Sequence, residues 1–154
     1  MKNLLFTFAL LLPILSFSQN QTKPFLNLED ALKITEAAQA KAQSEGWNVV
    51  IVILDDGGNL ISLRRMDGVQ VGSIEVAQAK AKSAVYFKRP TKVYEDLMKA
   101  EVGSRIATLP NAVGIEGGLP IFKDGFCIGA IGISGVTSAQ DGIIAAAGLA
   151  SIGQ

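Results

Sequence analysis

The chain has 154 residues, the length of one domain, with 14 basic and 14 acidic side chains and a formal net charge of zero. This balance excludes the basic surface of a general nucleic-acid binder and a polybasic membrane anchor. Apolar residues make up 49% and charged residues 18%, so the chain can bury a core. The absence of histidine excludes a Ser-His-Asp triad, a Cys-His pair and histidine ligands to zinc or iron. The single cysteine, Cys127, excludes an intrachain disulfide.

The N-terminus has the pattern of a secretory signal peptide. Lys2 precedes an apolar run, Leu4–Phe17, and Ser16 and Ser18 place small residues at positions −3 and −1 of a cleavage site. The run is too short to span a hydrocarbon core about 30 Å thick, and the alternative is a buried N-terminal helix. We therefore expect a periplasmic or secreted protein without a membrane span after cleavage. The expected organisation is a signal peptide at 1–18, a leader at 19–27 and a domain at 28–154.

The first half of the domain begins with a helical pattern. Asn27 is placed to cap this helix, and Gly46 to end it. The β-branched run Trp47–Leu54 predicts a strand buried on both faces. The turn Asp55–Asn59 leads to an alternating return strand, Leu60–Met66. Ser73 is expected to cap a second helix, which reaches Phe87 and is stopped by Pro90. Thr91 is expected to cap a third helix over Lys92–Val102.

The second half is expected to be mostly strand. Gly103–Gly118 is predicted to be irregular, apart from a short strand near Ala112–Ile115. Gly129 and Gly132 lie inside an expected strand and indicate close approach by a helix, another backbone or a ligand. The expected strands are Leu119–Phe122 and Phe126–Ser134, followed by a helix over Ile143–Ile152 after a Ser138/Asp141 capping box. The predicted fold is α+β, with about five mainly antiparallel strands flanked by helices.

Four motifs follow one another in a characteristic order. They are D-D-G-G-N-L-I-S-L-R-R-M-D-G (Asp55–Gly68), A-Q-A-K-A-K-S-A-V-Y-F-K-R-P-T (Ala77–Thr91), G-G-L-P-I (Gly117–Ile121) and D-G-F-C-I-G-A-I-G-I-S-G (Asp124–Gly135). Together they resemble the GlcG/HbpS-like family, described as haem-binding or haem-degrading, over residues 28–153. The resemblance implies a profilin-like fold and a homo-oligomer. Its members include secreted haem-binding proteins, proteins associated with glycolate metabolism and domains fused to corrinoid enzymes, so it implies the fold better than the function.

The candidate binding residues combine cations with aromatic rings. The stretch Arg64–Asp67 ends a strand, and its arginines, Arg65 above all, could clamp a carboxylate through two hydrogen bonds. The alternative is a salt bridge to Asp67 or across a subunit contact. The cations of Lys80 and Arg89, with the rings of Tyr86 and Phe87, match a porphyrin dicarboxylate. The alternative is an ordinary solvated helix face that carries one core phenylalanine.

Three further candidates depend on the backbone around them. Thr91 is expected to be a helix N-cap, or a weak oxygen ligand to haem iron. Gly117 and Gly118 could direct backbone N–H groups toward an anion, or form a turn that needs positive φ. Without histidine, iron is left with tyrosine, methionine, cysteine, a weak oxygen ligand or no protein ligand, so the metal ligand stays unassigned.

Binding is favoured over catalysis. The acidic residues mostly occupy expected turns and a cap, and no nucleophile–base pair or nucleotide-binding loop is present in the sequence, so no nucleotide cofactor is expected. The first hypothesis is an exported homo-oligomer that binds haem or a related tetrapyrrole. The alternatives are an enzyme or enzyme accessory acting on haem or a small carboxylic acid, and a structural oligomer without a ligand.

Overall fold

The computed structural model describes residues 22–100 and 103–154, so the predicted signal peptide lies outside the described residues. The helices are α1 (Leu28–Ser44), α2 (Ser73–Phe87), α3 (Thr91–Met98), α4 (Gly103–Ala107) and α5 (Ser138–Ala150), and the strands are β1 (Val50–Asp55), β2 (Leu60–Arg65), β3 (Gly118–Lys123) and β4 (Phe126–Ser134). None of the helices in these two ranges is long and apolar enough to cross a membrane. Leu26, which we assigned to the leader, is buried in the core.

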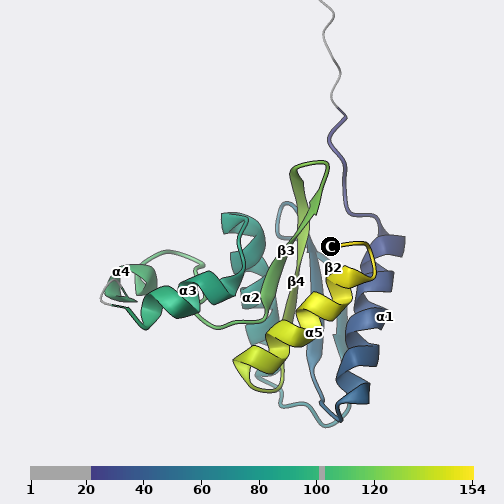
Figure 1. Ribbon diagram of the computed structural model, residues 1–154, viewed down its shortest axis with the longest axis horizontal. Coiled ribbons are helices and arrows are strands. Elements are labelled where there is room, and N and C mark those ends of the chain that lie inside the picture. Colours follow the sequence, from purple (N-terminus) through teal and green to yellow (C-terminus); the bar gives the residue numbers. More distant parts are fainter. Residues whose placement is uncertain (1–21, 101–102) are drawn as a thin grey trace, which may run out of the picture.

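The strands form one antiparallel sheet in the order β2-β1-β4-β3. Helices α1 and α5 pack together on one face, α2 covers the other, and α3 and α4 project beyond the β3 side of the sheet (Figure 1). The predicted α+β class is therefore confirmed. The sheet nevertheless has four strands within the described chain, because Ala112–Ile115 form a loop. Backbone N–H groups of this loop bond to helix side chains: Val113 donates to Ser83 Oγ at 3.1 Å.

Strand β1 lies in the middle of the core, as its apolar run predicted. Its residues Val50–Leu54 are all buried, because β2 and β4 flank the strand and helices cover both its faces. Ile51 and Ile53 belong to the core cluster beneath α1 and α5. Val50 and Val52 belong to the cluster beneath α2. The two clusters stabilise the three layers through burial of branched side chains at successive strand positions.

Helix α2 approaches strand β4 closely at Gly132. A Cβ atom at this glycine would lie 2.1 Å from the Ala77 carbonyl oxygen and 2.7 Å from the Ala81 backbone nitrogen. Gly129 lies equally close to the β1 backbone: a Cβ atom at this glycine would lie 2.4 Å from the Leu54 carbonyl oxygen. The prediction that these two glycines mark close approaches is therefore confirmed.

The structure corrects two of the expected helix starts. Ser73 is the first residue of α2 and Gly72 precedes it, so the Ser73 side chain does not cap the helix. Its hydroxyl oxygen is buried without a hydrogen-bond partner among the described residues. Thr91 is likewise the first residue of α3, which Pro90 precedes and which ends at Met98, short of the predicted end.

The caps of α1 and α5 depend on short side chains that fold back onto the helix. Asn27 Oδ1 accepts the Asp30 N–H at 2.7 Å, as predicted. Helix α5 is capped by Thr137, in a reciprocal capping box with Gln140, so the expected box at Ser138 is wrong by one residue. Asp141 is therefore not part of the helix cap, contrary to the prediction.

Candidate functional site

Lys80 is buried rather than available on the surface. Its side chain is 1% exposed, and its ammonium donates to Asp141 Oδ2 at 2.7 Å and to the Ile133 carbonyl oxygen at 3.0 Å. Burial raises the pKa of Asp141, and the hydrogen bond and charge of Lys80 act in the opposite direction. The structure therefore corrects two expectations: Lys80 does not offer its charge to a surface ligand, and Asp141 belongs to a core ion pair.

Thr91 and the glycine pair fix the start of β3 against α3. Thr91 is fully buried, and its Oγ1 accepts the Gly118 N–H at 2.9 Å. Both groups are therefore engaged with each other, which corrects the expectations of an iron-directed hydroxyl and of an anion-directed Gly118 N–H. Gly117 has φ +125°, so the alternative of a turn that needs glycine is confirmed there.

The two predicted aromatic residues face different surroundings. Tyr86 is 45% exposed beside the β1–β2 hairpin, and the Lys82 ammonium lies 5.5 Å from the centre of its ring. Phe87 packs edge-on against Tyr94, with ring centres 5.4 Å apart. The guanidinium carbon of Arg89 lies 5.9 Å from the centre of the Tyr94 ring. These residues form two local clusters rather than one flat aromatic platform.

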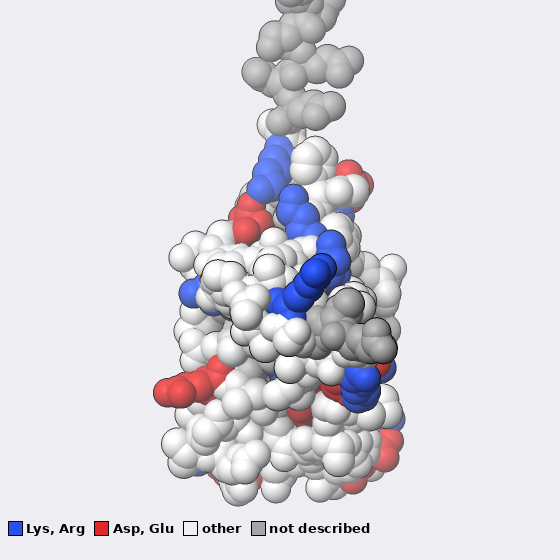
Figure 2. Space-filling view, turned by 90° about the vertical axis from the view of Figure 1, so that its left-hand side faces the viewer, with Lys and Arg blue, Asp and Glu red and all other residues white. Residues whose placement is uncertain are grey.

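Figure 2 shows the side of the molecule from which α3 and α4 project. Basic side chains gather over its upper half, and most of the remaining surface is uncharged. Arg89 is exposed just after α2, whereas Arg65 lies near the opposite end of that helix, where its Nη2 donates to the Val69 carbonyl oxygen at 3.4 Å. A 15-residue helix is about 22 Å long. Arg65 and Arg89 of one chain are therefore not brought together.

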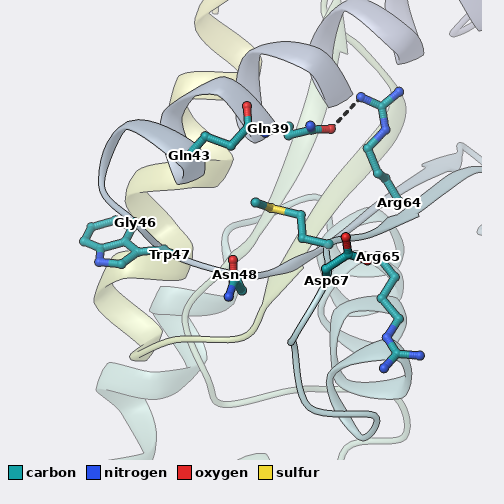
Figure 3. A pocket seen from close by; sticks show the side chains of 9 residues that line it. Gln39, Gln43, Gly46, Trp47, Asn48, Arg64, Arg65 and Asp67 are labelled. Atoms are coloured by element: carbon teal, nitrogen blue, oxygen red, sulfur yellow. Dashed lines mark hydrogen bonds between the residues drawn. The ribbon is translucent and has the colours of Figure 1, made fainter.

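A groove of about 510 Å³ lies at the end of α1 and includes the predicted anion clamp Arg64–Asp67 (Figure 3). Its volume is within the range of about 300–1,000 Å³ that is usual for ligand sites. The lining comes from the end of α1, the connection to β1, and the end of β2. Its residues are Gln39, Gln43, Gly46, Trp47, Asn48, Arg64, Arg65, Met66 and Asp67.

Local backbone geometry opens this groove. Gly46 takes φ +69° immediately after α1, and the Trp47 N–H donates back to the Ala42 carbonyl oxygen at 2.9 Å. This turn resembles the glycine-dependent endings common in helices and brings Trp47 round to the groove. On the other side, the Met66 N–H donates to the Val49 carbonyl oxygen at 3.1 Å and continues the β1–β2 pairing beyond β2.

Strand alternation decides which arginine faces α1. Arg64 pairs with Ile51, whose side chain lies beneath α1, and Arg65 pairs with Val50, whose side chain lies beneath α2. Arg64 Nη1 donates to Gln39 Oε1 at 2.8 Å, whereas Arg65 points away from this contact (Figure 3). Gln39 accepts a hydrogen bond from one of the five N–H donors of the guanidinium, so the others remain available to a ligand.

Trp47 is thus the site residue that the sequence prediction missed, while Arg64 and Met66 were predicted only as neighbours of Arg65 in an anion clamp. The groove offers an indole ring, a thioether and two guanidinium groups, bordered by amide side chains and one carboxylate, Asp67. A concave surface of this composition suits a ligand that combines an apolar plane with a carboxylate. The i, i+2 spacing of Arg64 and Met66 was the available signal.

A family model described as "Haem degrading protein HbpS-like" matches residues 26–150. The chain belongs to this family. Protein GlcG of Escherichia coli K12 is 38% identical to the HbpS-like chain over 114 residues, which cover 74% of this chain and 84% of GlcG. The resemblance stated from the four motifs is therefore confirmed.

Two solved structures share the fold of the HbpS-like domain. The PduOC:haem complex superposes with a TM-score of 0.78 and 32% identity, covering 84% of this chain and 96% of that one. A doubly substituted HbpS from Streptomyces reticuli superposes with a TM-score of 0.79 and 28% identity, covering 89% and 93%. These structures confirm the fold assignment.

Proposed function

We propose that this HbpS-like protein binds haem, and that it does so as an exported homo-oligomer. The observation that carries haem binding is the likeness to the PduOC:haem complex, at 32% identity and a TM-score of 0.78. The family description, a haem-degrading protein, points to the same ligand. Neither finding says where on this chain the porphyrin binds.

The groove beside α1 has side chains that fit haem. The Trp47 indole gives an apolar ring, the Arg64 guanidinium suits a propionate, and the Met66 thioether is among the side chains that ligate haem iron. Bound haem would supply an iron centre whose reactivity depends on its ligands and surroundings. The protein's own contribution is to hold the propionate and to shelter one porphyrin face. We place the proposed site here because the groove is concave and the aromatic rings near α2 are dispersed.

Haemin titration of the chain comprising residues 19–154 tests this function. We expect a saturable shift of the Soret band with a dissociation constant in the micromolar range, on the order of −8 kcal/mol. Buffer without protein, titrated with haemin in the same way, is the control for haemin aggregation. Linear, non-saturating absorbance would contradict haem binding. Loss of the Soret band after addition of ascorbate would assign haem degradation as well, in favour of the enzyme alternative.

Export and self-association can be examined on a single preparation. The apolar residues Ile143, Ala146 and Ala150 are exposed on α5, and this surface supports contact with a second copy. We expect the product from the periplasm or medium to begin near Gln19 and to scatter light as more than one chain at micromolar concentration. A cytoplasmic product that retains its N-terminus would contradict export, and the mass of one chain would contradict self-association.

A further inference from the structure

Met66 is the sulfur ligand that the groove offers to a porphyrin. Resting on the proposed haem function, we propose that Met66 Sδ binds the iron on one face and that Arg64, rather than Arg65, holds a propionate. Met66 lines the groove and packs partly against the core cluster beneath α1, which restricts its side chain. Met66 continues the pairing with β1 one residue beyond β2 and lies two positions after Arg64, so the two backbones are about 7 Å apart and the side chains share a face.

The other described tyrosine, cysteine and methionine side chains are less suited to this role. Cys127 and Tyr94 are 8% and 3% exposed, and burial raises the pKa of both groups, which disfavours the ionised forms that bind iron. Tyr86 lies on the outer surface against the hairpin and Lys82. Met98 is on α3, where its sulfur lies close to Gly114. Cys127 lines a smaller pocket of about 240 Å³, but its thiol is buried, so Met66 is the better-placed ligand in the larger groove.

The position of Arg64 adds a directional argument. Its guanidinium is held from one side by the Gln39 amide oxygen, which limits its rotamers before any ligand arrives. Arg65 donates instead toward Val69, on the other face of the sheet. Both arginines line the groove, but Arg64 is the one held on the α1 side, so we assign to Arg64 the carboxylate of a molecule seated between Met66 and α1.

The decisive measurement is the ferric spectrum of the haemin complex of residues 19–154. We expect a sulfur-to-iron charge-transfer band in the wild-type complex. Met66→Leu, which nearly conserves volume, should remove this band and weaken haemin binding about tenfold, while Met98→Leu should leave both unchanged. Met66→His should restore strong ligation with a histidine-type spectrum, which shows that the position itself faces the iron.

Methionine-methyl NMR gives a second readout that does not depend on the band. The sequence has three methionines, and residues 19–154 retain Met66 and Met98, so ¹³C-methyl labelling gives two assignable signals. Haemin should broaden or displace the Met66 signal and spare that of Met98. The ligand assignment would be overturned if the wild-type complex lacked the sulfur-to-iron band and its Met66 methyl signal stayed where it is in the haem-free protein. Haem binding itself would then still stand. Absence of any haemin binding by the wild type would overturn both.

The proposed contact between Arg64 and a haem propionate is tested by separate substitutions. Arg64→Ala should weaken haemin binding by about 10- to 150-fold, the effect of losing a charge-assisted hydrogen bond, and should leave the charge-transfer band in place. Arg89→Ala, outside the groove, is the matched control and should change the affinity less than twofold, and Arg65→Ala should weaken binding less than Arg64→Ala does. A larger loss with Arg65→Ala or Arg89→Ala than with Arg64→Ala would overturn the propionate assignment. Circular dichroism of each variant verifies that it is folded.

Discussion

Replacing Lys80 with methionine should lower the free energy of unfolding by about 3–5 kcal/mol. The substitution leaves the Asp141 carboxylate buried without its cation, and uncompensated buried charges have costs of this size. Urea denaturation followed by circular dichroism at pH 7 measures the loss. The matched control is Lys33→Met, which breaks an exposed pair with Glu29 and should change the stability little.

The Lys80–Asp141 ion pair also predicts the stability of a double variant and the effect of pH on Lys80→Met. A Lys80→Met, Asp141→Leu double variant should recover most of the lost stability, because replacing both buried charges with apolar groups is often nearly neutral. Lowering the pH should also lessen the deficit of Lys80→Met. Burial raises the pKa of the folded Asp141 carboxyl, so the variant is more stable below the ordinary aspartate pKa of about 3.9 and loses that stability as the pH rises through the raised value. A Lys80→Met variant as stable as Lys33→Met at pH 7 would contradict the ion-pair argument.

Gly132→Ala should destabilise the domain by about 3 kcal/mol. The added methyl group would meet the α2 backbone at the Ala77 carbonyl oxygen and the Ala81 nitrogen, and neither can move without shifting the helix away from the sheet. Overpacking of a filled core typically costs about 1–3 kcal/mol. Thermal unfolding monitored by circular dichroism measures the change as a lower Tm.

Gly72→Ala is the control for the loss of a glycine. Gly72 precedes α2 with φ −61°, and a Cβ atom there would meet nothing within 4 Å. The Tm of this variant should therefore stay close to that of the wild type. Equal Tm values for Gly132→Ala and Gly72→Ala would show that α2 does not hold its close position above β4.

The elements that the sequence predicted well are those specified by neighbouring residues. The helix over Leu28–Ser44 has a local cap and a regular apolar face, and the run before the Asp55 turn is apolar at successive positions because both faces of its strand are covered. The hydroxyl side chains were predicted less well. Thr91 begins its helix but uses its oxygen on Gly118, 27 residues away, and no local pattern distinguishes this role from capping.

The candidate site was only partly predictable for the same reason. The alternation of Arg64 and Arg65 was visible in the sequence, but which of them faces the groove depends on which side of the sheet α1 covers. Lys80 and Asp141 are 61 residues apart, so their pairing could not be inferred from spacing. In both cases the missing information was the placement of a helix on a sheet.

The two outer strands influence how copies of the chain can meet. Strand β2 ends in the adjacent arginines Arg64 and Arg65, and strand β3 carries Pro120, which lacks a backbone N–H donor. Charge and proline on edge strands oppose the addition of a further strand from another molecule. A continuous sheet across the proposed oligomer is therefore disfavoured, and the apolar outer face of α5 is the better contact surface. The same features protect the exposed edges from pairing that would lead to aggregation.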